Sequence, residues 1–139
     1  MITLVPLCTM TMTVDSAVNA GNAPTGRRMV AEISSATVSG RLAGQMTGGG
    51  NADWFTMTSD GLMLPDVRLA IQTHDQAIVL LHYSGRLRFV RGQDSVAFIA
   101  ATFETGDPRY LWINDIQAAG KGILSADLRT VEYEIFELT

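Results

Sequence analysis

The sequence predicts an antiparallel all-β protein, a sandwich or a barrel, with little or no helix. The dominant hydrophobic period is two, and no long stretch shows the period of a helix. Glycines, prolines and aspartates divide the chain into many short runs, which leaves no room for crossover helices between parallel strands. The chain has 139 residues, of which 47% are hydrophobic, so it can bury one sizeable core. We therefore expect one domain over residues 1–139.

The strands follow from alternation between turn signals. From Cys8 to Val14, four apolar residues alternate with three threonines, which predicts the first strand. Asp60-Gly61 favours a hairpin turn, because both residues tolerate positive φ. Residues 112–119 have room for one helical turn. The same reasoning predicts further strands over residues 28–38, 41–46, 53–58, 66–73, 77–83, 86–90, 96–103, 109–114 and 129–138.

Two predicted strands are apolar on both faces, namely Ala77 to Leu81 and Tyr110 to Ile113. Such strands must be covered on both sides. The interior of a barrel covers one side, and the chain offers no helix for the other. We therefore expect a second copy to cover it, in a homodimer. The alternative is a two-layer sandwich with an apolar edge.

Charge and composition exclude several classes of partner and cofactor. The net charge is -4, which argues against nucleic acid or an anionic membrane as the main partner. The single cysteine, Cys8, allows no intrachain disulfide, and His74 and His82 lack the spacing of metal ligands, so we expect no metal. The N-terminus has no basic start or unbroken apolar run typical of a signal peptide, and we expect a cytoplasmic protein.

Asp53 and Trp54 follow a glycine-rich loop, at the start of a predicted strand. A carboxylate packed against indole would have a raised pKa, which suits Asp53 to general acid–base work with Trp54 as an apolar wall. The alternative is that Asp53 caps the preceding turn and Trp54 fills the core. The loop itself, Gly48 to Gly50, lacks the lysine and helix of a phosphate-binding loop and is predicted to be a flexible hairpin at the rim.

Asp66 and Arg68 face the same side of one strand. If they point inward they form a buried pair that orients a ligand, and if they point outward they are a surface ion pair, which alternation alone favours. His82 shares a face with Ile78 and Leu80. It is either a residue of the core or rim, or an acid–base group of the site.

Residues 109–114 form the strongest local motif. On a strand, Tyr110, Trp112 and Asn114 would share one face and form a pocket that grips a flat organic ligand. The alternative is an aromatic core in which Asn114 bonds backbone at the end of the strand.

The order and spacing of several short motifs resemble domain of unknown function 3237, also called uncharacterised protein family 0311. The motifs that carry the resemblance are Pro24-Thr-Gly-Arg27-Arg28, Ser39-Gly40-Arg-Leu-Ala-Gly44, Gly50-Asn-Ala-Asp53-Trp54, Ser59-Asp60-Gly61, Asp66-Val-Arg68, Phe103-Glu-Thr105, Arg109-Tyr-Leu-Trp-Ile-Asn114 and Val131-Glu-Tyr-Glu-Ile-Phe136. The resemblance implies a single closed antiparallel β-barrel, lipocalin-like in outline, with an interior pocket. It also implies that Asp66 and Arg68 point inward, since a matching pair recurs in the family pattern.

The sequence departs from that pattern at two places. Thr73-His74-Asp75-Gln76 stands where the family usually has Thr-Asp-Asp-Gly, and Phe98-Ile99-Ala100 where it often has Phe-Arg-Thr. A ligand contact made by that arginine would be absent here.

Together these features predict a cofactor-independent enzyme of secondary metabolism. A few family members are similar, by pathway context, to cofactor-free cyclases or isomerases. We expect cyclisation, isomerisation or a lyase step on a hydrophobic or aromatic small molecule inside the barrel. The alternatives are a non-catalytic binding or carrier barrel and a structural subunit without a ligand. The expected catalytic residues are Asp53, Asp66 and His82, and the expected substrate-binding residues are Trp54, Arg68, Tyr110, Trp112 and Asn114.

Overall fold

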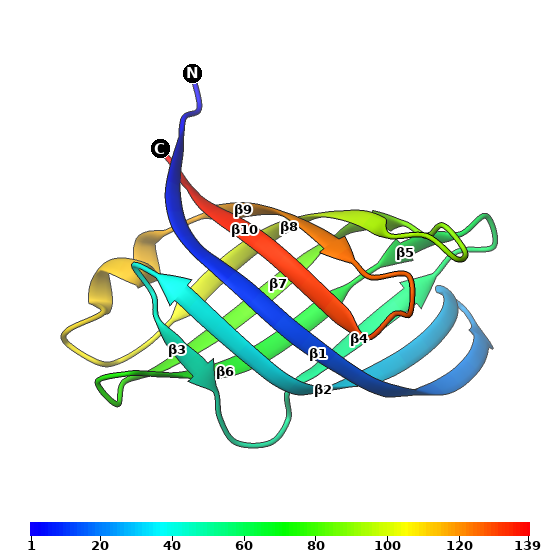
Figure 1. Cartoon of the computed structure of the whole chain (residues 1–139), viewed down its shortest axis with the longest axis horizontal. Coiled ribbons are helices and arrows are strands. Elements are labelled where there is room, and N and C mark those ends of the chain that lie inside the picture. Colours follow the sequence, from blue (N-terminus) through cyan, green and yellow to red (C-terminus); the bar gives the residue numbers. More distant parts are fainter.

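The computed structural model describes residues 1–139 and contains ten antiparallel strands and one turn of 3-10 helix, η1 (Figure 1). The all-β prediction is confirmed. η1, with five residues, is far too short for a membrane-spanning helix. The elements are β1 (Leu4–Ala23), β2 (Gly26–Gly40), β3 (Gly44–Met46), β4 (Ala52–Met57), β5 (Leu62–Leu64), β6 (Asp66–Thr73), β7 (Ile78–Arg88), β8 (Ser95–Glu104), η1 (Leu111–Asp115), β9 (Ala118–Leu124) and β10 (Thr130–Leu138).

The strands form one sheet that returns on itself as a ring. β1 pairs with both β10 and β2, and β7 through β10 follow one another by antiparallel pairing. Between β2 and β7 the ring is irregular, because the short strands β3 and β5 share that space with β4 and β6. The ring is therefore not a regular barrel of continuous strands, although every strand pairs with neighbours on both sides over part of its length.

The β1–β2 hairpin extends beyond the ring. β10 pairs with β1 only as far as Thr13, while β2 accompanies β1 to its end at Ala23. In Figure 1 this part of the hairpin curls past the end of the ring opposite η1. The strand is longer than its apolar alternation, which ends at Val14, because the mostly small or polar residues that follow still pair with β2 through their backbone.

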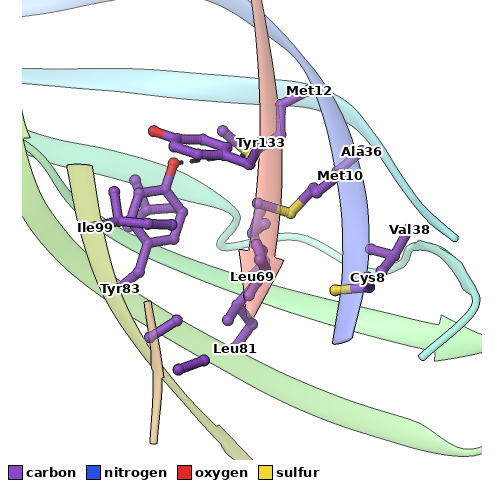
Figure 2. Close-up of a cluster of buried hydrophobic side chains, with 14 of the residues drawn as sticks. Cys8, Met10, Met12, Ala36, Val38, Leu69, Leu81, Tyr83, Ile99 and Tyr133 are labelled. Atoms are coloured by element: carbon purple, nitrogen blue, oxygen red, sulfur yellow. Dashed lines mark hydrogen bonds between the residues drawn. The ribbon is translucent and has the colours of Figure 1, made fainter. Parts of the chain in front are cut away.

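The core fills the ring with side chains that alternate along each strand. On β8, the residues at every second position from Ser95 to Phe103 are buried and the others are exposed. Figure 2 shows methionines of β1 meeting leucines of β6 and β7 and the rings of Tyr83 and Tyr133. The β9 backbone approaches Tyr133 so closely that a Cβ on Gly122 would lie 2.4 Å from its ring. Glycine is therefore needed at this point of β9.

The predicted strand over residues 109–114 is wrong. β8 ends at Glu104, and the Asp107 carboxylate accepts hydrogen bonds from the Arg109 backbone N–H and Nε, which turns the chain. η1 follows, and Ile113 and Ile116, three apart, are buried at this end of the ring. A short apolar run is compatible with a strand or with a helical turn, so hydrophobic periodicity alone does not distinguish the two structures for residues 109–114.

Three other strands also differ from the prediction. β9 was not predicted, because its segment Ala-Ala-Gly-Lys-Gly-Ile-Leu is poor in the β-branched and aromatic residues that mark strands. β5 was not predicted either, and the two strands expected over 77–83 and 86–90 are one strand, β7, which continues through Gly85.

Candidate functional site

An apolar pocket of about 300 Å³ lies inside the end of the ring opposite η1. Fifteen of its 18 lining residues are hydrophobic, and two of the other three are aspartates, Asp15 and Asp53. The walls come from β1, β2, β4, β5, β7, β9 and β10 and from the loops next to them. Such a space suits an apolar small molecule and offers it few polar groups.

Asp53 stands on β4 where the strand changes partner. β4 pairs with β6 through Ala52 and Asp53, and with β5 from Thr56 onward. The change leaves the backbone N–H of Asp66 without a strand partner, and Oδ1 of Asp53 accepts its hydrogen bond at 2.9 Å. Asp53 therefore points inward, with one oxygen fixed by the sheet and with Oδ2 making no hydrogen bond to the protein.

The environment of Asp53 favours its neutral form. Burial in the apolar pocket raises the pKa of this carboxyl from 3.8 to about 6, against the opposing effect of the Asp66 hydrogen bond. The nearby negative charge of Asp66 adds to the rise. The sequence predicted a raised pKa here, and this direction agrees, but the apolar pocket is its cause and not an indole ring.

Tyr83 and Tyr133 also line this pocket, and Figure 2 shows their two phenol rings next to each other. Their ring centroids are 5.3 Å apart in an edge-to-face arrangement, and the Tyr83 hydroxyl donates to Sδ of Met12 at 3.9 Å. Burial raises the pKa of Tyr83 well above its usual value and that of Tyr133 to about 12. Both rings therefore stay protonated near neutral pH and can donate hydrogen bonds to a ligand oxygen.

Neither tyrosine was among the predicted site residues, although the signal for one was present. Tyr133 lies between Glu132 and Glu134 in an alternating strand, which places it inward. Tyr83 lies next to His82 on β7 and points to the opposite face, into the ring.

Trp54 does not wall the pocket. Its side chain is 57% exposed on the outer face of β4, because Asp53 points inward and the next residue must point outward. The alternative, that Trp54 fills the core, is wrong as well.

Asp66, Arg68 and His82 lie on the outer face of β6 and β7. The inward orientation implied by the family resemblance is wrong, because Val67 and Leu69 occupy the core and their neighbours on β6 must face out. Nε2 of His82 lies 2.9 Å from Oδ1 of Asp66, so these two side chains pair on the surface. The backbone N–H of Asp66 bonds the Asp53 carboxyl, but the side chains of Asp66, Arg68 and His82 do not line the pocket into which Asp53 points.

Tyr110, Trp112 and Asn114 lie at the η1 end, away from the pocket. The Asn114 amide accepts from the Thr105 N–H and donates to the Thr105 carbonyl, so it bonds backbone, as the alternative interpretation held. Trp112 packs under the Arg41 guanidinium at 5.0 Å. The Tyr110 hydroxyl donates to Asp75 at 2.8 Å. The expected shared face does not exist, because the segment is not a strand.

The structure contains no group of three or more His, Cys, Asp or Glu side chains placed to hold a metal ion. Cys8 is a free, buried thiol in the core. Burial raises its pKa to about 12, which makes it a weak nucleophile.

Comparison with known proteins gives a family and several similar structures. The family model described as a protein of unknown function, DUF3237, matches residues 2–138. A β-barrel-like protein from Acinetobacter baumannii AYE superposes with a TM-score of 0.88 at 25% identity, covering 100% of this chain and 97% of that one. A protein of unknown function from Clostridium acetobutylicum gives 0.87 at 22%, with 100% of both chains covered. No curated protein matches the chain.

A more distant structure is described as an enzyme from Penicillium herquei. Its TM-score is 0.75 at 20% identity, and the match covers 99% of this chain and 95% of that one. At this identity the likeness shows a common fold.

Proposed function

Because the chain belongs to the DUF3237 family, whose function is unknown, we propose a function from the pocket itself: a cofactor-independent enzyme for a hydrophobic or aromatic small molecule. The reaction would be a cyclisation, an isomerisation or a lyase step inside the ring. The observation that carries the proposal is the Asp53 carboxyl, fixed at one oxygen and facing a pocket with 15 hydrophobic residues among its 18 lining residues. The ring of paired strands would act as a closed barrel, lipocalin-like in outline, around this pocket.

Asp53 suits proton transfer near neutral pH. A carboxyl whose pKa is about 6 is present in both forms between pH 5 and 7, and an acid–base catalyst is most effective when its pKa lies near the working pH. The Asp66 N–H holds Oδ1, which leaves Oδ2 to take a proton from one atom of the substrate and return it to another. Such a step consumes no cofactor and leaves the enzyme unchanged.

The two tyrosines complement the carboxyl. Their hydroxyls remain protonated and lie in a low-dielectric pocket, where a hydrogen bond to an oxygen that gains negative charge is strongest. Asp53 would move the proton, and Tyr83 or Tyr133 would hold the enolate or phenolate oxygen.

The Penicillium herquei structure weakly supports a catalytic role. It is described as an enzyme and shares the fold over 99% of this chain. A fold that hosts an enzyme elsewhere is compatible with one here, while the reaction has to come from the site.

A non-catalytic carrier is the second candidate. The apolar lining, 15 of 18 residues, is the observation that favours it, since a carrier needs only shape and apolar surface. In that case the only role of Asp53 would be to accept the Asp66 N–H hydrogen bond where β4 meets β6.

The decisive experiment incubates wild-type protein and Asp53→Asn with a library of apolar and aromatic metabolites. Mass spectrometry identifies the compounds that remain bound, and chromatography coupled to it identifies the compounds that are converted, including products of unchanged mass. We expect both proteins to retain the same compounds with affinities within a few-fold, and only the wild type to convert them. Asparagine keeps an oxygen to accept the Asp66 N–H, so the sheet junction survives the change.

One control variant and one pH profile test the interpretation further. Met63→Trp fills the pocket wall on β5 and should abolish retention, which places the bound compounds in the pocket. The conversion rate should rise through about pH 6 if Asp53 acts as a base, and fall if it acts as an acid. Retention without conversion by the wild type would support the carrier. Full activity of Asp53→Asn would refute Asp53 as the catalytic group.

We also propose that the protein forms a homodimer through the outer face of β8 and β9. Val96, Phe98 and Ile123 are 41%, 59% and 40% exposed there, and Val96 pairs with Ile123 across the two strands. Lys121 extends over the Phe98 ring at 6.0 Å. An apolar patch on an otherwise mixed surface suits a second copy of the same chain.

A further inference from the structure

A second hollow lies on the outside of the ring, separate from the interior pocket. This outer groove is an open space of about 700 Å³ over β6, β7 and β8, bounded by the glycine-rich loop before β4 and by Asn114 of η1. Arg68 lies across from His82 in the strand register, and His82 lies across from Thr102. Three polar side chains thus form one row across the floor of the groove.

The glycine loop offers unused backbone donors beside this row. The N–H groups of Gly48, Gly49 and Gly50 make no hydrogen bond to any protein acceptor. Gly48 and Gly50 have φ of 67° and 79°, whereas φ of Gly49 is not positive. Successive amides with alternating backbone conformation form the concave arrangement that binds anions in many proteins.

The loop is held in place against β6. The Asn51 amide donates to the carbonyls of Thr47 and Gly48, and Oδ1 of Asn51 accepts the Ala70 N–H at 2.8 Å. Asn51 is 5% exposed, so this anchor is part of the packed structure. The glycines that follow Thr47 therefore stay beside the strand that carries Arg68.

The charged groups of the groove are unequally engaged. Arg68 makes no ion pair and no hydrogen bond to the protein, so its guanidinium fork is free for a planar oxyanion. His82 is paired with Asp66 through Nε2, which leaves Nδ1 available. Glu104 also lines the groove and has no partner.

We propose that the outer groove binds a small organic monocarboxylate. Its carboxylate would lie between the Arg68 guanidinium and the amides of Gly49 and Gly50, with Nδ1 of His82 as a further contact. Its apolar body would cover Leu80, which lines the groove and is 51% exposed. The carboxylates of Asp66 and Glu104 disfavour a doubly charged phosphate, so a single negative charge fits best.

The test is a titration of uniformly ¹⁵N-labelled protein with benzoate, followed by NMR, with benzamide as the uncharged analogue. We expect benzoate to cause saturable shifts centred on the amides of Gly48, Gly49 and Gly50, and benzamide to bind at least tenfold more weakly. Arg68→Gln should weaken benzoate binding at least tenfold and keep the dispersed spectrum of a folded protein.

Two variants distinguish binding in the outer groove from binding elsewhere on the protein. Arg27→Gln removes an exposed, unpaired arginine of β2 outside the groove, and should change the affinity less than twofold. Asp53→Asn should also leave benzoate binding unchanged, so that failure of the interior site and failure of this one are distinguishable. Equal weakening by Arg27→Gln and Arg68→Gln, equal binding of benzamide, or shifts centred on pocket residues would each overturn the proposal.

Discussion

Asp53 is held in a position that suits proton transfer and costs stability. Its carboxyl satisfies an otherwise unpaired backbone N–H of β6, and it does so facing an apolar pocket. A group with a raised pKa in the folded state favours folding when it is protonated, and this contribution is lost as the pH rises from the unfolded to the folded value. For Asp53 that window runs from 3.8 to about 6.

Asp53→Asn should therefore make the protein more stable at neutral pH. The amide avoids burying a charge, and the gain should be about 3 kcal/mol at pH 8, from 1.36 kcal/mol per unit of the pKa shift from 3.8 to about 6. The difference should shrink as the pH falls below 6. Urea unfolding at pH 8, 6 and 4 measures it, with Glu132→Gln on the exposed face of β10 as the control. A pH-independent difference would show that ionisation of Asp53 is not its cause.

For single residues, the alternation of apolar and polar positions predicted side-chain direction better than the selection of candidate catalytic residues predicted the site. The inward direction of Tyr133 and the outward direction of Asp66 and Arg68 follow from the period of two. The raised pKa of Asp53 was expected, but its cause was misassigned, because neighbours in sequence on a strand point to opposite faces. The hydrogen bond from the Asp66 N–H to Asp53 depends on the register in which β4 pairs with β6. A single sequence does not reveal that register.

Among the elements, β9 depends on small residues for its place beside β10. Gly122→Ala would bring a methyl group to 2.4 Å from the Tyr133 ring, so the ring or the strand must move. We expect a loss of about 1–3 kcal/mol in the free energy of unfolding, as for an overpacked core. Gly49→Ala is the matched control, since its Cβ would meet nothing within 4 Å. Equal effects of the two variants in urea unfolding would contradict this account.

η1 should contribute to stability without contributing to the pocket. Asn114→Ala removes both side-chain hydrogen bonds to the Thr105 backbone and should cost about 1–3 kcal/mol, because two backbone groups lose their partners. Retention of compounds by the interior pocket should be unchanged in Asn114→Ala and in Trp112→Ala. A large loss of retention in either variant, with the fold intact, would place η1 at the site after all.

The elements differ in how far the sequence predicts them. Strands with clean alternation, such as β8 and β10, are found within one or two residues. β9 carries two glycines, and only their close packing against Ile99 and Tyr133 of the neighbouring strands explains them. η1 depends on the turn at Asp107 and on the space at the end of the ring. Neither feature produces a hydrophobic periodicity in the sequence.

For the whole molecule, the proposed homodimer gives the clearest test. Sedimentation at micromolar concentration should show twice the chain mass for the wild type. Phe98→Glu places a charge in the centre of the patch on β8 and β9 and should give a monomer. Val18→Glu, at a residue 73% exposed on the hairpin extension, should remain a dimer. A wild-type monomer across the micromolar range would refute the assembly.

The fold class was predictable because a period of two without a helical stripe leaves few architectures. The inference that β7 is apolar on both faces also agrees with the structure, where Ile78 and Leu80 are 44% and 51% exposed. The irregular part of the ring was not predictable, since β3 and β5 have only three residues each and pairing, not composition, defines them.

The extension of the β1–β2 hairpin has a kinetic consequence. From Val14 to Ala23, β1 has β2 on one side and no strand on the other, while Val14 and Ala17 line the interior pocket. A strand paired on one side only opens at a smaller free energy than the fully paired ring. This part of the hairpin can therefore open locally while the rest of the ring stays folded. Under the proposed function, a small molecule would enter and leave the pocket through this opening. Amide hydrogen exchange should be fastest along residues 15–23 and slowest in β8. A covalent cross-link that holds residues 15–23 against the ring should slow the release of a ligand by a larger factor than it changes the equilibrium affinity.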